Sequence, residues 1–125
     1  IVDRYVPNED LATYFAAADA LVLPYLSATQ SAALQLGFSF GLPAIATAVG
    51  GLKEELEHGV NGLLVEPGSA TALATAIVEF WQCGLAEKLS AGVREVANRF
   101  SWETVVSLLE QAAQPSPRRP SSKPQ

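Results

Sequence analysis

GLPAIATAVGG, residues 41–51, combines a helix-ending glycine, a strand and a glycine turn, and this pattern indicates the fold class. Gly41 ends an apolar helix, and the strand at residues 43–48 begins with a proline, which the first position of a strand tolerates. Gly50 and Gly51 turn the chain into a short charged helix at residues 52–57. Because strand-like and helix-like segments alternate along most of the chain, we predict a parallel α/β sheet with helices on its faces.

Upstream of this stretch the same alternation continues. Residues 1–6 are predicted to form a first strand, and Pro7 and Asn8 a turn with an N-cap. The next helix has an apolar face that we expect to pack on the sheet, made of Leu11, Tyr14, Phe15 and Ala18. Residues 20–23 are apolar without polar alternation, as in a strand covered on both sides, and residues 31–40 should form a buried helix.

Downstream, residues 63–65 complete about four strands of a partial Rossmann-like sheet, and the pattern then becomes helical. Three helices are predicted from apolar spacing: Leu73, Ala76, Ile77 and Phe80; Leu89, Val93, Val96 and Phe100; Trp102, Val105, Val106 and Leu109. From Pro115 onward the chain has four prolines, three serines and no large apolar residue. We therefore expect one domain at residues 1–113 and a disordered tail at residues 114–125.

The composition limits the partners. The chain has 125 residues and is 49% hydrophobic, which is enough for one buried core. Thirteen acidic residues face eight basic ones, three of which lie in the last eight positions, so no nucleic-acid-binding surface is expected. No stretch is long and apolar enough for a membrane span. The chain begins inside a predicted strand and without a methionine, so we expect a fragment of a longer protein.

Ligands of an open parallel sheet bind at the carboxyl ends of the strands, where loops lead into helix amino termini. The richest such loop is Tyr25-Leu26-Ser27-Ala28-Thr29-Gln30-Ser31, because small and hydroxylic residues directly precede a helix with free backbone N–H groups. It is a candidate seat for a diphosphate, although the same residue types are ordinary N-caps. Val49, Gly50 and Gly51 form a second loop at this edge, either for close approach to a ligand or only for the turn.

Other reactive side chains favour structural interpretations. His58 stands alone at a predicted helix end, where a surface histidine is favoured over a catalytic base. Cys83 has no histidine partner, and one thiol with one histidine can form neither an internal disulfide nor a structural zinc site. Glu54, Glu55 and Glu57 are expected on the solvated face of a short helix. The residues alone therefore identify no catalytic group and no metal site.

The order of several blocks resembles the group-1 (GT4) glycosyltransferases, which have the GT-B fold. The matching blocks lie at residues 6–11 with 14–24, 41–47, 49–54, 59–65 and 100–103, so the likeness covers residues 1 to about 110. The resemblance implies the donor-binding part of a two-domain enzyme that transfers a sugar, with retention and without a required metal or other cofactor, from a nucleoside diphosphate sugar. It also implies an acceptor-binding domain upstream, a cytoplasmic location and, as one alternative, peripheral association of the full enzyme with the inner face of the membrane.

The chain departs from the family at two glutamates, whose positions fall on Ala28 and Leu36. In the family the first faces the donor sugar and the second the ribose, so both contacts are missing here. Residues 27–31 resemble a divergent bacterial subgroup in which the small loop keeps its phosphate role and Gln30 or Gln35 partly replaces the glutamates. The phosphate would then be held by residues from Ser27 to Ala32.

The same resemblance places the backbone of Tyr5 and Val6 near the nucleobase, and the basic residues that clamp the diphosphate upstream of Ile1. We expect an open hollow beside Val6 and Gly50, and an isolated chain that is inactive and binds nucleotide weakly. Two alternatives stay open: a sugar-nucleotide epimerase of the same fold, and a degenerate, non-catalytic interaction module. A receiver-like flavodoxin fold is disfavoured, since no strand ends in the acidic cluster that its metal needs.

Overall fold

The computed structural model describes residues 1–99, so the third predicted helix, with Trp102 and Leu109, and the predicted tail lie outside the described residues. The elements follow the predicted alternation of helices and strands. In chain order they are α1 (Asn8–Ala17), β1 (Leu21–Leu23), α2 (Ala32–Ser39), β2 (Ala44–Thr47), α3 (Gly50–Glu55), β3 (Gly62–Val65), α4 (Ala70–Gln82) and α5 (Leu85–Arg99).

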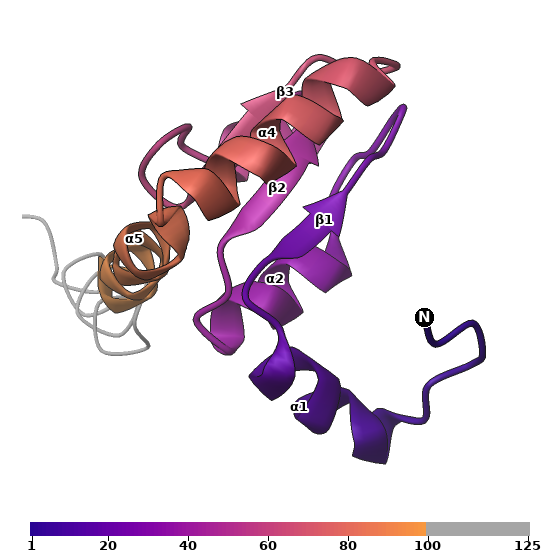
Figure 1. Ribbon diagram of the computed structural model, residues 1–125. Helices are drawn as coiled ribbons and strands as arrows, with labels where there is room; N and C mark the ends of the chain where they lie inside the picture. The colour runs from indigo at the N-terminus through magenta and orange to yellow at the C-terminus, as the bar shows by residue number, and fades with distance from the viewer. Residues whose placement is uncertain (100–125) are drawn as a thin grey trace, which may run out of the picture.

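The three strands form one parallel sheet in the order β1-β2-β3 (Figure 1). In the register, Leu21 lies opposite Ala44, and Ile45 lies opposite Leu63. Parallel neighbours need a crossover between them, and α2 and α3 supply these crossovers. The predicted class, a parallel α/β sheet with flanking helices, is confirmed.

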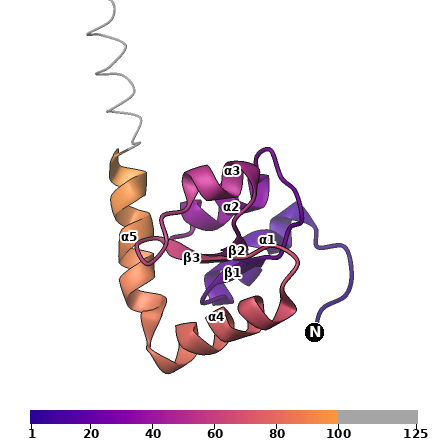
Figure 2. The same cartoon turned by 90° about the horizontal axis from the view of Figure 1, so that it is seen from above.

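Both faces of the sheet carry a hydrophobic core, because alternate residues of β2 point to opposite sides. Ala44 and Ala46 join a cluster with Leu34 of α2 and Leu52 of α3. Ile45 faces the other way; its cluster also contains Leu63, Ala76, Phe80 and Leu89. Figure 2 shows the resulting layers, with α2 and α3 on one side of the sheet and α4 on the other. Burying each large side chain stabilises the fold by about 1.5–3 kcal/mol.

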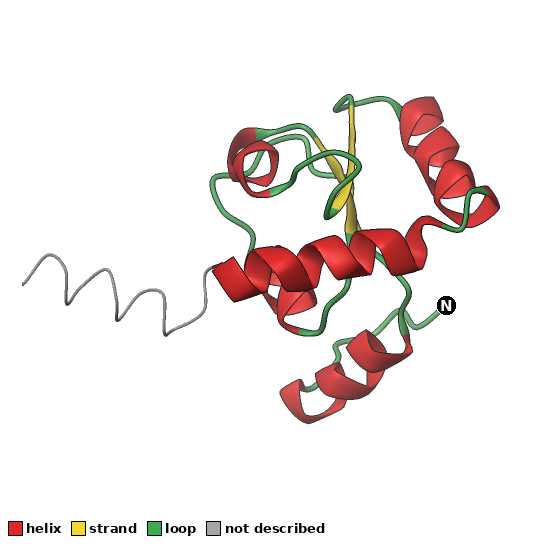
Figure 3. Ribbon diagram, turned by 90° about the vertical axis from the view of Figure 1, so that its left-hand side faces the viewer, coloured by secondary structure: helices red, strands yellow, loops and turns green. Residues whose placement is uncertain are grey.

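The last described helix, α5, runs across the end of the sheet at which the strands begin (Figure 3). It contacts α4 on one side and α2 on the other. Its Ser90 hydroxyl donates to the carbonyl oxygen of Gly41 at 2.6 Å, just before β2. Gly92 lies so close to the carbonyl oxygen of Val60, just before β3, that a Cβ atom would overlap it.

The strand predicted at residues 1–6 is wrong: within residues 1–99 the sheet has three strands, not about four, and Tyr5 is 81% exposed. Asp3 and Arg4 interrupt the apolar run, so its burial would not offset the cost of ordering it. The outer edge of β1, where a further strand could pair, is unoccupied within residues 1–99. Figure 1 shows the amino terminus beside the start of α1 instead.

The prediction that α1 packs a face on the sheet is also wrong, because none of its residues is buried. Phe15 instead contacts the far end of α2: its ring lies 5.4 Å from that of Phe40 and beside Gly37. Val22 of β1 is 41% exposed, so this strand is not covered on both sides as predicted. No helix within residues 1–99 combines the length and apolar character needed to cross a membrane.

Candidate functional site

The carboxyl ends of the three strands lie at one edge of the sheet, and three loops leave it there. The loop after Leu23 leads into α2, the turn after Thr47 into α3, and the loop after Val65 into α4. Parallel pairing fixes this arrangement, because every strand runs in the same direction. This is the edge at which α/β sheets bind ligands.

A hollow of about 550 Å³ opens in the loop after β1. Its lining residues are Tyr25, Ser27, Ala28, Thr29 and Gln30. The side chains of Ser27, Thr29 and Gln30 are exposed, and we find no hydrogen bond for them within residues 1–99. Their hydroxyl and amide groups are therefore available as donors to a ligand.

The amino terminus of α2 lies directly behind this loop. Ser31 is its N-cap: the side chain is 5% exposed, and its Oγ accepts a hydrogen bond from the Leu34 amide at 3.1 Å. The amides of Ala32 and Ala33 have no acceptor within residues 1–99. The hydroxyl oxygen of Ser31 thus caps the helix, while the Ala32 and Ala33 amides stay free to bind an anion. The positive end of the helix dipole also favours an anion there.

Gly50 and Gly51 lie against the back of the same loop. A Cβ atom at Gly50 would overlap the carbonyl oxygen of Ala28, and one at Gly51 that of Thr29. The Gly51 amide donates to the Ala28 carbonyl at 3.3 Å, which caps α3 in place of a side chain, since Val49 provides none. The sequence left open a turn or close approach to a ligand; the structure brings these glycines against the loop backbone.

Thr47 also contacts this loop, although it was not among the predicted site residues. Its side chain is 4% exposed, and its hydroxyl donates to the Tyr25 carbonyl at 2.5 Å. The signal in the sequence was a lone hydroxyl in an otherwise apolar strand, AIAT. A buried hydroxyl needs a partner, and here the partner is the start of the candidate loop.

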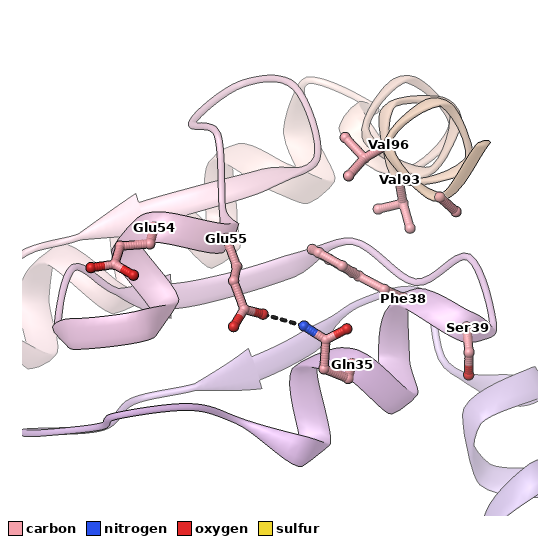
Figure 4. Close-up of a pocket in the computed structure, with 8 residues that line it drawn as sticks. Gln35, Phe38, Ser39, Glu54, Glu55, Val93 and Val96 are labelled. Atoms are coloured by element: carbon pink, nitrogen blue, oxygen red, sulfur yellow. Dashed lines mark hydrogen bonds between the residues drawn. The ribbon is translucent and has the colours of Figure 1, made fainter. Parts of the chain in front are cut away.

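The residues expected near the ribose and base do not line this hollow. Tyr5 and Val6 do not line the hollow, and Figure 1 shows their segment well away from the tip of the loop after β1. Leu36 is half-buried within α2. Gln35 donates to the Glu55 carboxylate of α3, as Figure 4 shows. The structure thus gathers Ser27 to Gln30 at one hollow, but it does not bring Tyr5, Val6 or Gln35 to it.

Gln35 and Glu55 belong to a separate groove of about 650 Å³ between α2, α3 and α5 (Figure 4). The other residues that line it are Phe38, Ser39, Glu54, Val93, Val96 and Ala97. This groove is larger than the hollow after β1, but it lies at the other end of the sheet. Val93 and Val96, which line it, come from α5, the helix that crosses the sheet where the strands begin. A nucleotide is expected at the opposite end, so we assign the candidate site to the loop after β1.

His58 and Asn61 make structural contacts outside this hollow. His58 is exposed, and its Nδ1 accepts a hydrogen bond from the Leu64 amide at 3.0 Å. Asn61, which is 1% exposed, accepts from the Glu57 amide at 2.8 Å and donates to the Glu55 carbonyl at 3.3 Å. Cys83 is exposed at the end of α4. Residues 1–99 contain no group of three His, Cys, Asp or Glu side chains placed to hold a metal ion.

Comparison with known proteins identifies the family of this chain. The model of the family described as glycosyl transferases group 1 matches residues 1–83. A D-inositol 3-phosphate glycosyltransferase from Geodermatophilus obscurus is 39% identical over 111 residues, covering 85% of this chain and 24% of the relative. A glycogen synthase from Thermus thermophilus is 30% identical over 103 residues, covering 80% and 23%. The chain thus spans about a quarter of the length of these relatives.

Solved structures match the fold as well. Sucrose-phosphate synthase from Thermosynechococcus elongatus superposes with a TM-score of 0.71 at 34% identity, covering 86% of this chain and 27% of that protein. Anabaena Alr3699/HepE, solved in complex with UDP, gives a TM-score of 0.70 at 24% identity, with 82% and 29% covered. At that identity the likeness to HepE concerns the fold alone.

Proposed function

Because this chain belongs to the group 1 glycosyl transferases, we propose that it forms the donor-binding part of an enzyme of this family. The enzyme would move a sugar, with retention, from a nucleoside diphosphate sugar to a glycan, lipid or small-molecule acceptor. In this proposal the diphosphate lies in the hollow at Ser27, Ala28, Thr29 and Gln30, in front of the first amides of α2. The chain would be completed by an upstream acceptor-binding domain.

The main observation that supports this proposal is that the hollow lies next to the free amides of Ala32 and Ala33. Backbone N–H groups and the positive end of a helix dipole hold phosphate without a lysine or arginine. They are also fixed before the reaction, so they can stabilise charge on the departing diphosphate without reorganising. The position of the loop at the carboxyl edge of the sheet agrees with this role.

The finer parts of the proposal follow from the family resemblance. With Ala28 and Leu36 in place of two glutamates, the donor sugar and ribose would lack these two carboxylate partners. We propose that Gln30, which lines the hollow, replaces one of these contacts. Gln35 is less suited to the ribose than expected, because its amide is bonded to Glu55. The full enzyme is proposed to act in the cytoplasm, in solution or at the inner face of the membrane.

An amide-NMR titration tests the diphosphate site. The ¹⁵N-labelled chain is titrated with UDP, GDP and ADP into the millimolar range, with uridine as the matched ligand that lacks phosphate. UDP is the first choice because HepE, a protein of the same fold, was solved with UDP and with UDP-glucose. We expect weak binding, with shifts of the amides from Ser27 to Ala32 that need the diphosphate.

Two outcomes would contradict the proposal. Shifts confined to the groove at Phe38 and Val93 would move the site away from the loop. A submicromolar affinity would overturn the claim that the isolated chain is an incomplete site. For the whole protein, the corresponding test is transfer or hydrolysis of nucleotide sugars: no turnover of any donor would favour a non-catalytic interaction module.

A further inference from the structure

Thr47 carries a buried hydroxyl that the proposed site does not itself use. It is the one polar residue of β2, whose other members, Ala44, Ile45 and Ala46, are buried in the two cores. A valine of the same shape would avoid the cost of taking a hydroxyl out of water. The contacts of the Thr47 hydroxyl must therefore explain why a hydroxyl is buried at this position.

Those contacts are with the backbone that leaves β1. The Thr47 hydroxyl donates to the Tyr25 carbonyl at 2.5 Å, and the Leu23 carbonyl lies farther away at 3.4 Å. A hydroxyl has one proton, so the shorter contact with Tyr25 is the hydrogen bond that counts. Tyr25 is the first residue of the loop that lines the hollow, so this bond fixes the path of the loop backbone where it leaves β1.

The turn that follows Thr47 holds the middle of the same loop. The Gly51 amide donates to the Ala28 carbonyl, and the backbone of both glycines touches the loop closely enough to exclude any side chain. Within residues 1–99 we find no other hydrogen bond from residues 25–30 to the rest of the chain. The shape of the hollow thus depends on a short connection, residues 47–51, that need not touch the ligand.

We infer that Thr47 is a positioning residue for the diphosphate site, acting through the Tyr25 carbonyl rather than by contact with the nucleotide. The inference rests on the proposed function for its effect on binding, but its effect on the loop stands by itself. Removing the hydroxyl leaves the Tyr25 carbonyl without its donor and frees the start of the loop. The seat for the phosphates then becomes mobile, and binding must order it first.

The test compares Thr47→Val, which deletes the hydroxyl, with Thr47→Ser, which keeps it, in ¹⁵N-labelled chain. Thr75→Val is the matched control, because Thr75 bonds to the Thr71 carbonyl at 2.9 Å on α4, away from the loop. We expect Thr47→Val to lower the order parameters of the amides from Leu26 to Thr29 and to weaken UDP binding about fivefold. Thr47→Ser should restore both, and Thr75→Val should change neither.

The outcomes separate this inference from the proposed function. If the loop of the ligand-free Thr47→Val variant stays as rigid as in the wild type, or UDP affinity is unchanged, Thr47 does not position the site. If wild-type chain binds no nucleotide, the proposed function fails, while the relaxation data still decide whether Thr47 fixes the loop. Should Thr47→Val not fold, the smaller Thr47→Ala is measured in the same way.

Discussion

The hydroxyl of Ser90 donates a hydrogen bond to the carbonyl oxygen of Gly41 at 2.6 Å, although 49 positions separate the two residues. The Ser90 hydroxyl oxygen in turn accepts a hydrogen bond from the Arg94 guanidinium at 3.1 Å. Ser90 therefore joins α5 to the turn that precedes β2. That turn belongs to the stretch from which the fold could be predicted.

Ser90→Ala should lower the free energy of unfolding by about 1 kcal/mol, because the Gly41 carbonyl loses its donor. Urea denaturation followed by circular dichroism measures the change. Ser39→Ala is the control, since Ser39 is exposed and its hydroxyl bonds only to the Leu36 carbonyl of its own helix. An equal loss in both variants would show that the Gly41 bond contributes nothing specific.

Gly92→Ala should destabilise the fold, although alanine is the better helix former by about 1 kcal/mol. The added Cβ would overlap the Val60 carbonyl oxygen, and such overpacking costs about 1–3 kcal/mol or more. The neighbouring Ala91 is exposed, so Ala91→Gly should lower the free energy of unfolding only by the difference in helix propensity, about 1 kcal/mol. A more stable Gly92→Ala variant in thermal unfolding would mean that α5 does not dock at Val60.

Asn61→Ala should cost about 2 kcal/mol of stability, because it leaves the Glu57 amide and the Glu55 carbonyl without partners. Asn61→Asp keeps the acceptor but turns a carboxylate oxygen toward the Glu55 carbonyl, so we expect it to be no milder. Asn98→Ala, on the exposed side of α5, should stay within about 0.5 kcal/mol of the wild type. Chemical denaturation of the three variants in parallel gives the comparison.

Thr29→Glu should weaken the binding of UDP by the chain about tenfold, because it adds a negative charge where the diphosphate is proposed to lie. Thr13→Glu makes the same change on exposed α1, away from the hollow, and should leave the affinity within about twofold. Both are read from the UDP titration at fixed ionic strength. Equal affinities for the two variants would place the phosphates outside the loop.

Much of the architecture could be predicted because it is encoded locally. The strand after Pro43, with Gly41 before it and Gly50 after it, is where the pattern placed it, and the core face of α4 includes the predicted Ala76 and Phe80. Hydrophobic periodicity and glycine positions carry this information along the chain itself. The family resemblance, confirmed by the family model over residues 1–83, rests on the same blocks.

The errors occur where structure depends on partners distant in sequence. Residues 1–6 have enough apolar side chains for a strand, but a strand needs a neighbour, and within the described chain none pairs with them. Phe15 and Tyr14 gave α1 an apolar face, yet periodicity does not specify what that face meets. A local pattern therefore specifies neither which edge of the sheet stays open nor what covers a helix face.

The candidate site was predictable as a loop but not as a set of contacts. The hydroxylic residues before α2 pointed to Ser27, Thr29 and Gln30, which line one hollow. The lone hydroxyl of β2 marked Thr47, but the sequence did not reveal that its partner would be Tyr25, because that contact depends on how the loops after β1 and β2 place their backbones. The role of these residues in nucleotide binding remains a prediction until it is measured.

The path of α5 has a consequence for how the domain comes apart. Because this helix contacts α2 on one face of the sheet and α4 on the other, detaching either layer breaks contacts with α5. Losing one layer therefore weakens the other, and unfolding should be all-or-none. A denaturation curve recorded from amides of α2 should coincide with one recorded from amides of α4.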